Sequence, residues 1–137
     1  MAEAIRLVDY FYIETPDKPG EAVRVLNQLK DAGVNLLAFS GFPKGRRAQL
    51  DFVPADPAAF KAVAKKNKWK ATGPKKCFHI QGDDRVGALA EVMQKLVEAK
   101  INVTATDAVC AGENYYGVIL WVKPLDVRRA AKALGIS

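Results

Sequence analysis

An internal repeat with a period of 67 residues constrains the fold of this chain more than any other feature. Without a gap, apolar positions, glycines and prolines of the first half align with similar residues of the second half, as in repeat architectures. Two segments of similar composition would not by chance align both their turn-forming glycines and prolines and their core positions. The chain is therefore a duplication of one small unit. The aligned pairs include Phe11 and Phe78, Ile13 and Ile80, Asp17 and Asp84, Gly20 and Gly87, Asn35 and Asn102, and Pro57 and Pro124.

Each copy has the same expected order of strands and helices. Short aromatic segments predict strands, apolar residues at three- and four-residue spacing predict a helix over 20–32, and Asp56 with Pro57 marks the start of a second helix. The order is βαββαβ. We therefore expect an α+β fold of two tandem ferredoxin-like copies, each with an antiparallel sheet and its helices on one face. In the first copy the strands are expected at 7–14, 34–42, 48–54 and 69–72.

The boundary between the copies is expected near residue 73, with domains at 1–73 and 74–137. The second copy runs out of chain early, so its last strand is expected to be short or missing. Because the fourth strand of this fold lies beside the first, strand 76–82 would then have an unpaired edge. Bare edges are usually covered, and we expect strand 69–72 or a second chain to pair there.

Three positions indicate how the backbone turns between elements. Gly33 follows the first helix, where glycine adopts the left-handed conformation that ends many helices. Lys100 holds the equivalent place in the second copy, so that helix is expected to end at a higher cost. Gly45 supplies a positive φ for the turn between two strands of the first copy.

Charge and composition limit the classes of partner. The net charge is +6, and lysines crowd between residues 61 and 76, which favours acidic partners. A solvated helix face explains the lysines as well, since single-strand binding would interleave aromatic residues and only Trp69 does so. No signal peptide and no apolar run of about 20 residues is present, and two cysteines with one histidine match no metal or disulfide spacing. We expect a cytoplasmic protein without metal, cofactor or membrane association.

Both copies carry one signature across a strand, a turn and a helix. Residues 15–39 and 82–106 each place an acidic residue, a basic residue and a glycine at the turn, then an amphipathic helix, then Val-Asn or Ile-Asn. This pattern resembles that of ACT domains, the small-molecule-binding regulatory modules, and the resemblance covers nearly the whole chain. It implies a stand-alone regulatory protein that binds an amino acid and acts through a homodimer or a partner metabolic enzyme, with no catalytic residues of its own.

The resemblance also implies where an effector binds: the glycine turn of one domain faces the Asn that opens a strand of a neighbour. A turn glycine lets the backbone approach a ligand, a helix start suits a carboxylate, and Asp can meet an ammonium group. The same residues have purely structural explanations as turn, capping and packing residues. The implied binding residues are Asp17, Lys18, Pro19, Gly20 and Asn35 in the first copy, and Asp84, Arg85, Val86, Gly87 and Asn102 in the second.

Two alternatives on the same fold are an RNA-binding protein and a pure protein-interaction module. RNA-recognition motifs share the βαββαβ order, but residues 44–52 lack stacking aromatics and residues 112–120 lack the leading basic residue of that motif. We therefore expect no nucleic-acid partner. A small enzyme is a third possibility that fold alone permits. Cys110 has no candidate base and is interpreted as a small packing residue, so we expect no enzyme activity.

Overall fold

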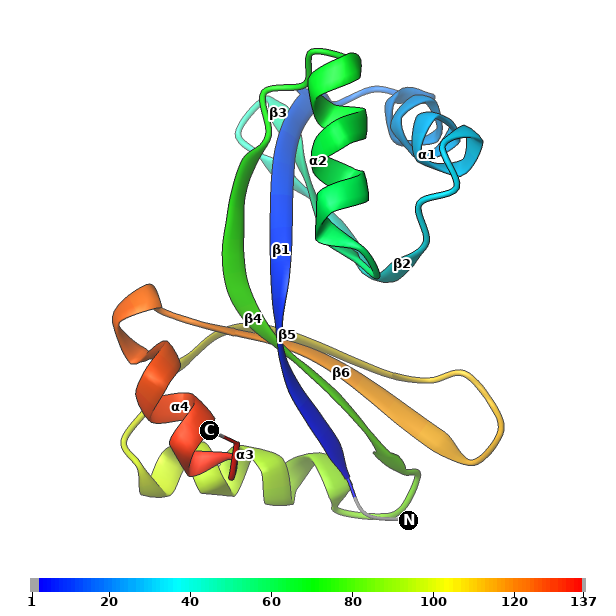
Figure 1. Ribbon diagram of the computed structural model, residues 1–137. Helices are drawn as coiled ribbons and strands as arrows, with labels where there is room; N and C mark the ends of the chain where they lie inside the picture. The colour runs from blue at the N-terminus through cyan, green and yellow to red at the C-terminus, as the bar shows by residue number, and fades with distance from the viewer. Residues whose placement is uncertain (1–2, 137) are drawn as a thin grey trace. The chain divides into compact units, whose positions relative to one another are not determined.

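The computed structural model describes residues 3–136. The chain divides into two compact units, Asp9–Lys75 and Met1–Val8 with Lys76–Ser137. We call the former the first-repeat unit and the latter the second-repeat unit. Both have the expected α+β architecture of antiparallel strands with two helices, and each is described by itself below (Figure 1).

The first-repeat unit has the strand order β2-β3-β1-β4, to which β1 contributes its C-terminal part and β4 its first residues. Phe11 of β1 and Phe52 of β3 both contact Phe60 of α2, with ring centroids 4.6 and 5.3 Å from that of Phe60. Val25 and Leu29 of α1 complete this core, so both helices cover the same face of the sheet. The elements are β1 (Ala4–Pro16), α1 (Glu21–Asp31), β2 (Leu36–Lys44), β3 (Arg47–Pro54), α2 (Pro57–Lys66) and β4 (Thr72–Asp83).

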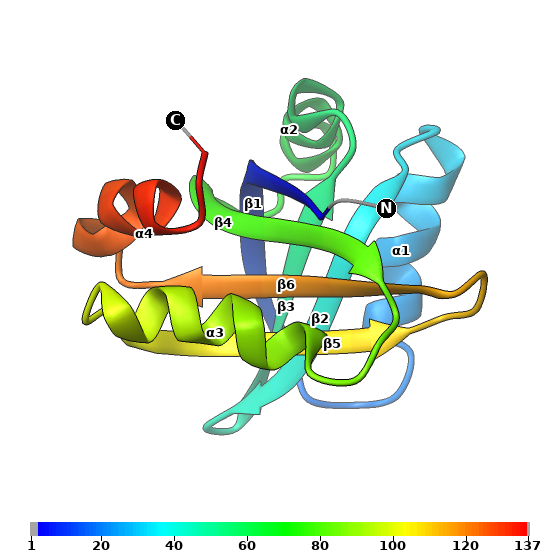
Figure 2. The ribbon, with the colours of Figure 1, turned by 90° about the horizontal axis from the view of Figure 1, so that it is seen from below.

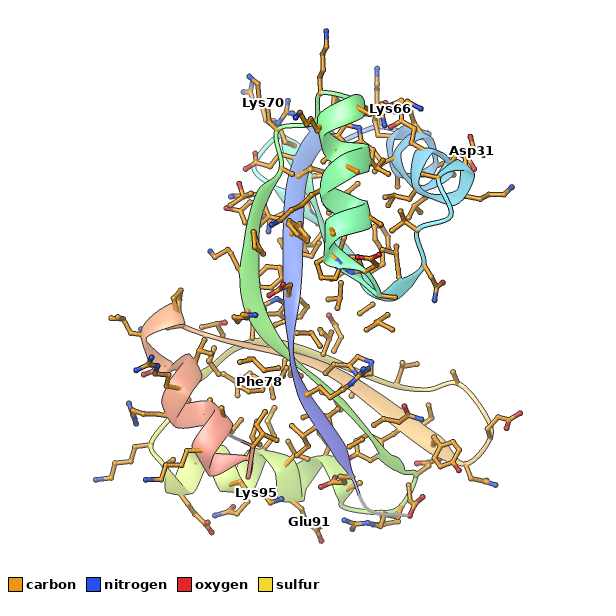
Figure 3. The ribbon with its side chains drawn as sticks, viewed as in Figure 1. Asp31, Lys66, Lys70, Phe78, Glu91 and Lys95 are labelled. Carbon is orange, nitrogen blue, oxygen red and sulfur yellow. The ribbon has the colours of Figure 1, made fainter. Side chains whose placement is uncertain are left out.

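The second-repeat unit repeats this arrangement with the strand order β1-β4-β6-β5. Figure 2 shows α3 and α4 together on one face of β4, β6 and β5. Phe78 and Ile80 of β4 are fully buried against α3, and Phe78 lies between the strands and the helices in Figure 3. The further elements are α3 (Ala88–Glu98), β5 (Val103–Cys110), β6 (Tyr115–Val122), a 3-10 turn (Pro124–Asp126) and α4 (Val127–Ala133).

The N-terminal end of β1 takes the place of the fourth strand that the second repeat lacks. After α4, residues 134–136 form no strand. Instead, Ile5 packs on the core of the second-repeat unit and Arg6 Nη2 lies 3.3 Å from His79 Nδ1 of β4. Burial and the Arg6 charge lower the pKa of His79, which favours the neutral ring.

The expectation that strand 69–72 or a second chain covers this edge is therefore wrong. Trp69 is partly buried and packs against Phe60 of α2, and β4 begins only at Thr72, while residues 4–8 supply the strand. The structure also groups residues 3–8 with the second repeat rather than with the first, and residues 73 and 74 lie inside β4 rather than in a linker. The physical reason is that β1 has 13 residues, more than the usual 3–10 of one strand, and so serves both units.

Helix starts differ between the repeats in a way that follows from single residues. Asp56 caps α2 as predicted, because its Oδ1 accepts hydrogen bonds from the N–H groups of Ala58 and Ala59 at 3.1 and 3.3 Å. Lys123 holds the equivalent position, and no side chain among residues 3–136 caps that start. The second helix of that repeat accordingly begins with the 3-10 turn.

At the helix ends, Lys100 adopts the left-handed conformation that glycine has in the first repeat. Gly33 ends α1 with φ 73°, and Lys100 ends α3 with φ 58°, although it has a Cβ. Both ends make the same two bonds: Lys100 N–H donates to Val97 O and Ile101 N–H to Leu96 O, each at 2.9 Å. This is a Schellman motif, which usually takes glycine at the position of Lys100.

We predict that Lys100→Gly raises the free energy of unfolding by about 0.5–1 kcal/mol, because it removes the left-handed strain of a side chain. Denaturant unfolding followed by circular dichroism measures the change. The matched control Lys100→Ala keeps the Cβ and should give no gain. Equal stabilisation by both substitutions would attribute the effect to loss of the lysine charge instead of relief of strain.

Candidate functional site

A cavity of about 170 Å³ lies at the turn between β4 and α3 of the second-repeat unit. It brings together two of the sequence-predicted binding residues, Asp84 and Arg85, with the first turn of α3 and the far end of β5. Its lining combines apolar side chains with an acidic one, Asp84. The lining residues are Asp84, Arg85, Ala88, Leu89, Ala108, Val109, Cys110 and Tyr116.

The turn depends on Gly87, which has φ 84°. Glycine adopts this left-handed conformation without steric cost, and the chain then enters α3 at Ala88. Among residues 3–136, no side chain caps this helix start. The first N–H groups of a helix have no intrahelical partner and carry partial positive charge. The open start of α3 therefore suits a carboxylate that enters the cavity.

Arg85 is already engaged by a carboxylate. Its guanidinium makes two bonds to Glu91, one of them 3.2 Å from Nη1 to Oε1. The hydrogen bond to Arg85 lowers the pKa of Glu91, and the reciprocal bond raises the pKa of Arg85. Glu91 points away from the strands (Figure 3). A ligand carboxylate would have to replace Glu91 before it could pair with Arg85.

Asp84 and Cys110 face each other across the cavity. The hydrogen bond between the Cys110 thiol and the Asp84 carboxyl raises the pKa of Cys110, since both the bond and the negative charge favour the neutral thiol. Cys110 is exposed, so its interpretation as a packing residue is wrong. Tyr116 also lines the cavity. Burial raises the pKa of its hydroxyl, which donates a hydrogen bond to the Glu3 carboxylate.

Neither Asn102 nor Val86 joins this cavity. Val86 is fully exposed at the tip of the turn. Asn102 precedes β5, whose first residue pairs with Val122, whereas the cavity lies where Cys110 pairs with Tyr116. Seven residues of strand separate the two ends, or roughly 23 Å at 3.3 Å per residue. Within this unit the turn and the asparagine therefore lie at opposite ends of the sheet.

The first-repeat turn has the same backbone but different surroundings. Asp17, Lys18 and Pro19 are exposed, and Gly20 has φ 91° at the start of α1. Glu21 follows directly and pairs with Arg24 at 3.3 Å, whereas the second repeat has Ala88 at this place. α3 also has a carboxylate in its first turn, Glu91, but it lies three residues after Ala88 and pairs with Arg85. The carboxylate of Glu21 is at the first helical position, where it repels an incoming ligand carboxylate more strongly, so this turn is the less suitable of the two.

Asn35 is also remote from the first-repeat turn. It precedes β2, whose first residue pairs with Pro54, whereas the turn lies near the end where Lys44 pairs with Arg47. The backbone carbonyl of Asn35 accepts a hydrogen bond from the N–H of Ala55 at 2.9 Å. This contact is made by the backbone of residue 35 and does not depend on the asparagine side chain.

Sequence reasoning missed the residues on β5 and β6 that line the cavity. Val109, Cys110 and Tyr116 lie more than twenty residues beyond the turn, and only the pairing of β5 with β6 brings them to it. No motif marked them. The alternation of residues along β5 alone could not show which of its ends meets α3.

Across residues 3–136, no three His, Cys, Asp or Glu side chains are placed to hold a metal ion. In the same part of the chain, the helices are all too short or too polar to cross a membrane.

No protein-family model and no curated protein matches this chain. Solved structures do. A protein of Bacteroides thetaiotaomicron has a TM-score of 0.81 and 19% identity, covering 95% of this chain and 88% of that one. The ligand-free regulatory subunit of aspartate kinase from Thermus thermophilus has a TM-score of 0.64 and 19% identity, covering 98% and 95%. The regulatory subunit from Thermus flavus has a TM-score of 0.60 and 22% identity, covering 98% and 95%. The chain therefore has the ferredoxin-like α+β fold of these regulatory subunits.

Proposed function

We propose that this protein is a regulatory module that binds an amino acid at the turn of the second repeat. The observation that carries the proposal is the cavity that holds the Asp84 carboxyl and the open start of α3 together. An α-amino acid displays an ammonium group and a carboxylate on one carbon. The ammonium group pairs with Asp84, and the carboxylate accepts hydrogen bonds from the N–H groups that follow Gly87.

The size and walls of the cavity support an effector of this kind. Its volume of about 170 Å³ is below the roughly 300–1,000 Å³ of pockets for drug-sized ligands. Leu89 and Val109 offer apolar surface beside the polar groups, which suits a small side chain. Gly87 and Asp84 are the residues on which the proposal depends most, whereas Val86 and Asn102 are not expected to contact an effector bound within this unit.

Several solved structures with this fold are regulatory subunits of a metabolic enzyme, aspartate kinase. This likeness supports a regulatory output through a partner enzyme or a homodimer, and a protein without catalytic activity of its own. The effector then acts by favouring one state of association, with a coupling free energy of order 1–3 kcal/mol.

The RNA-binding alternative loses support from the sheet of the first repeat. Asp51 pairs directly with Tyr12 across β1 and β3, so a carboxyl group stands where a second stacking aromatic would be needed. A pure protein-interaction module stays open as an outcome of the ligand screen.

We predict that one or more of the twenty amino acids raises the thermal stability of the purified protein. A ligand that binds only the folded state stabilises it by ~2.7 kcal/mol at a hundredfold excess over Kd. Gly87→Asp should abolish this response, because aspartate tolerates the left-handed backbone while its charge repels the effector carboxylate. Differential scanning fluorimetry with each amino acid measures both effects.

Gly20→Asp is the matched control, because it places the same side chain on a glycine of similar φ in the first repeat. This variant should respond like the unmodified protein. If Gly20→Asp lost the response and Gly87→Asp kept it, the effector site would lie in the first repeat. A flat result with all twenty amino acids would favour the interaction module.

We predict that Cys110 reports on the site through its reactivity. Its thiol pKa is raised by Asp84, so Asp84→Asn should lower that pKa and accelerate alkylation by iodoacetamide near pH 8 severalfold. A bound effector should protect Cys110 in the unmodified protein. The only other cysteine, Cys77, is fully buried. The alkylation rate of the Cys110→Ser variant measures the background contribution of Cys77. An unchanged rate in Asp84→Asn would show that the carboxyl does not control the thiol.

A further inference from the structure

The positive charge of this protein is concentrated in the first-repeat unit. That unit has twelve Lys and Arg against seven Asp and Glu, whereas the second-repeat unit has nine against eight. The two units have the same fold, so the fold does not require the difference. A local excess of positive charge favours anionic ligands at that place.

Part of this charge surrounds a cavity of about 280 Å³ in the first-repeat unit. Phe11 and Ile13 point into the core beneath the helices, so Tyr12 and Glu14 lie on the opposite face of the sheet. The cavity lies at these residues, with Arg47 at the start of β3, Thr72 at the start of β4 and Lys70 two residues before it. Lys70 is seen at this end of β4 in Figure 3.

Two further lysines reach the same face. The Nζ atoms of Lys44 and Lys75 each lie 5.8 Å from the centroid of the Tyr12 ring. Four cationic side chains therefore gather around one tyrosine: Lys44, Arg47, Lys70 and Lys75.

Glu14 already serves as an internal anion in this cluster. Its Oε2 is 3.2 Å from Lys44 Nζ, and its Oε1 is 3.8 Å from Arg47 Nε. Arg47 also donates through Nη2 to the backbone carbonyl of Glu14 at 3.1 Å, which holds the guanidinium beside the cavity. Exposed ion pairs of this kind exchange readily, since the attraction between solvated charges contributes little net stability.

We propose that this face of the first repeat binds a phosphate monoester, with Arg47 and Lys70 on the phosphoryl oxygens and the Thr72 hydroxyl as a further donor. Two carboxylates, Glu14 and Asp51, face these four cations, since Asp51 lies directly across from Tyr12 and interacts with Lys44 and Lys75. Positive charge therefore remains uncompensated, and a phosphate dianion balances it. Guanidinium groups bind phosphate through paired hydrogen bonds and ammonium groups bind it as point charges. The cavity exceeds a phosphoryl group in size and also receives a small organic part.

This site is separate from the effector cavity of the second repeat and differs from it in chemistry. The first-repeat turn has Glu21 where an effector carboxylate would bind, while the sheet of the same repeat has the cationic cluster. The protein would thus bind two ligands of different classes, one in each unit.

Nuclear magnetic resonance of the ¹⁵N-labelled full-length chain tests the proposal, with adenosine 5′-monophosphate as the probe and adenosine as its phosphate-free control. We expect the monophosphate to give saturable shifts of the amides of Tyr12, Arg47 and Thr72, and adenosine to give none. Arg47→Ala and Lys70→Ala should each weaken binding about tenfold, as for loss of a charged hydrogen bond. Glu14→Gln should strengthen binding, because the competing carboxylate is gone.

Lys61→Ala is the matched control, since Lys61 is an exposed lysine of the same unit on α2 and should leave the affinity unchanged. Equal weakening by Lys61→Ala, or tighter binding of a single-stranded oligonucleotide with a steep salt dependence, would show diffuse polyanion binding and overturn the proposal. Absence of saturable shifts would also overturn it. Gly87→Asp should keep the monophosphate response, and Arg47→Ala should keep the amino-acid response, so each hypothesis fails independently.

Discussion

Backbone hydrogen bonding at the outer edge of β4 is the requirement on which the rest of this structure depends. β4 pairs with β6 on one side, and its other side needs a strand because exposed edges pair with other chains. Residues 134–136, which follow α4, form no strand. The first residues of β1 take that position, so the beginning and the end of the chain form one unit. Neither repeat is therefore an independent half of the sequence.

Duplication leaves two copies of one turn, and single residues decide what each can bind. Gly20 and Gly87 give both turns the same left-handed backbone. The next residue is Glu21 in one copy and Ala88 in the other, so only the second helix start is free of a carboxylate in its first position. Conversely, the cationic cluster of Lys44, Arg47, Lys70 and Lys75 lies on the sheet of the first repeat. Under the two proposals made above, different side chains on the same backbone would let one fold bind two ligand classes.

The effector cavity connects elements that are distant in the sequence, and this gives regulation a structural basis. Its walls come from the turn before α3 and from the last residues of β5. In the proposed binding mode, a ligand hydrogen-bonded to Asp84 and to the first turn of α3 would also contact Val109 of β5, and would so link the helix to the strand. Ligand binding would then shift the association equilibrium, provided that the distance between α3 and β5 differs between the associated and the free protein.

The sequence by itself determined the features that depend on local interactions. The repeat, the βαββ order, the Asp56 cap and the strained end at Lys100 follow from short-range spacing and from the conformations that single residues prefer. Only the tertiary structure decided which strand covers β4, that Cys110 faces Asp84, and that Asn102 lies far from Gly87. These depend on strand pairing, in which partners are chosen by backbone hydrogen bonds that every residue can make. Side-chain patterns therefore predict that a strand forms but not which neighbour it finds.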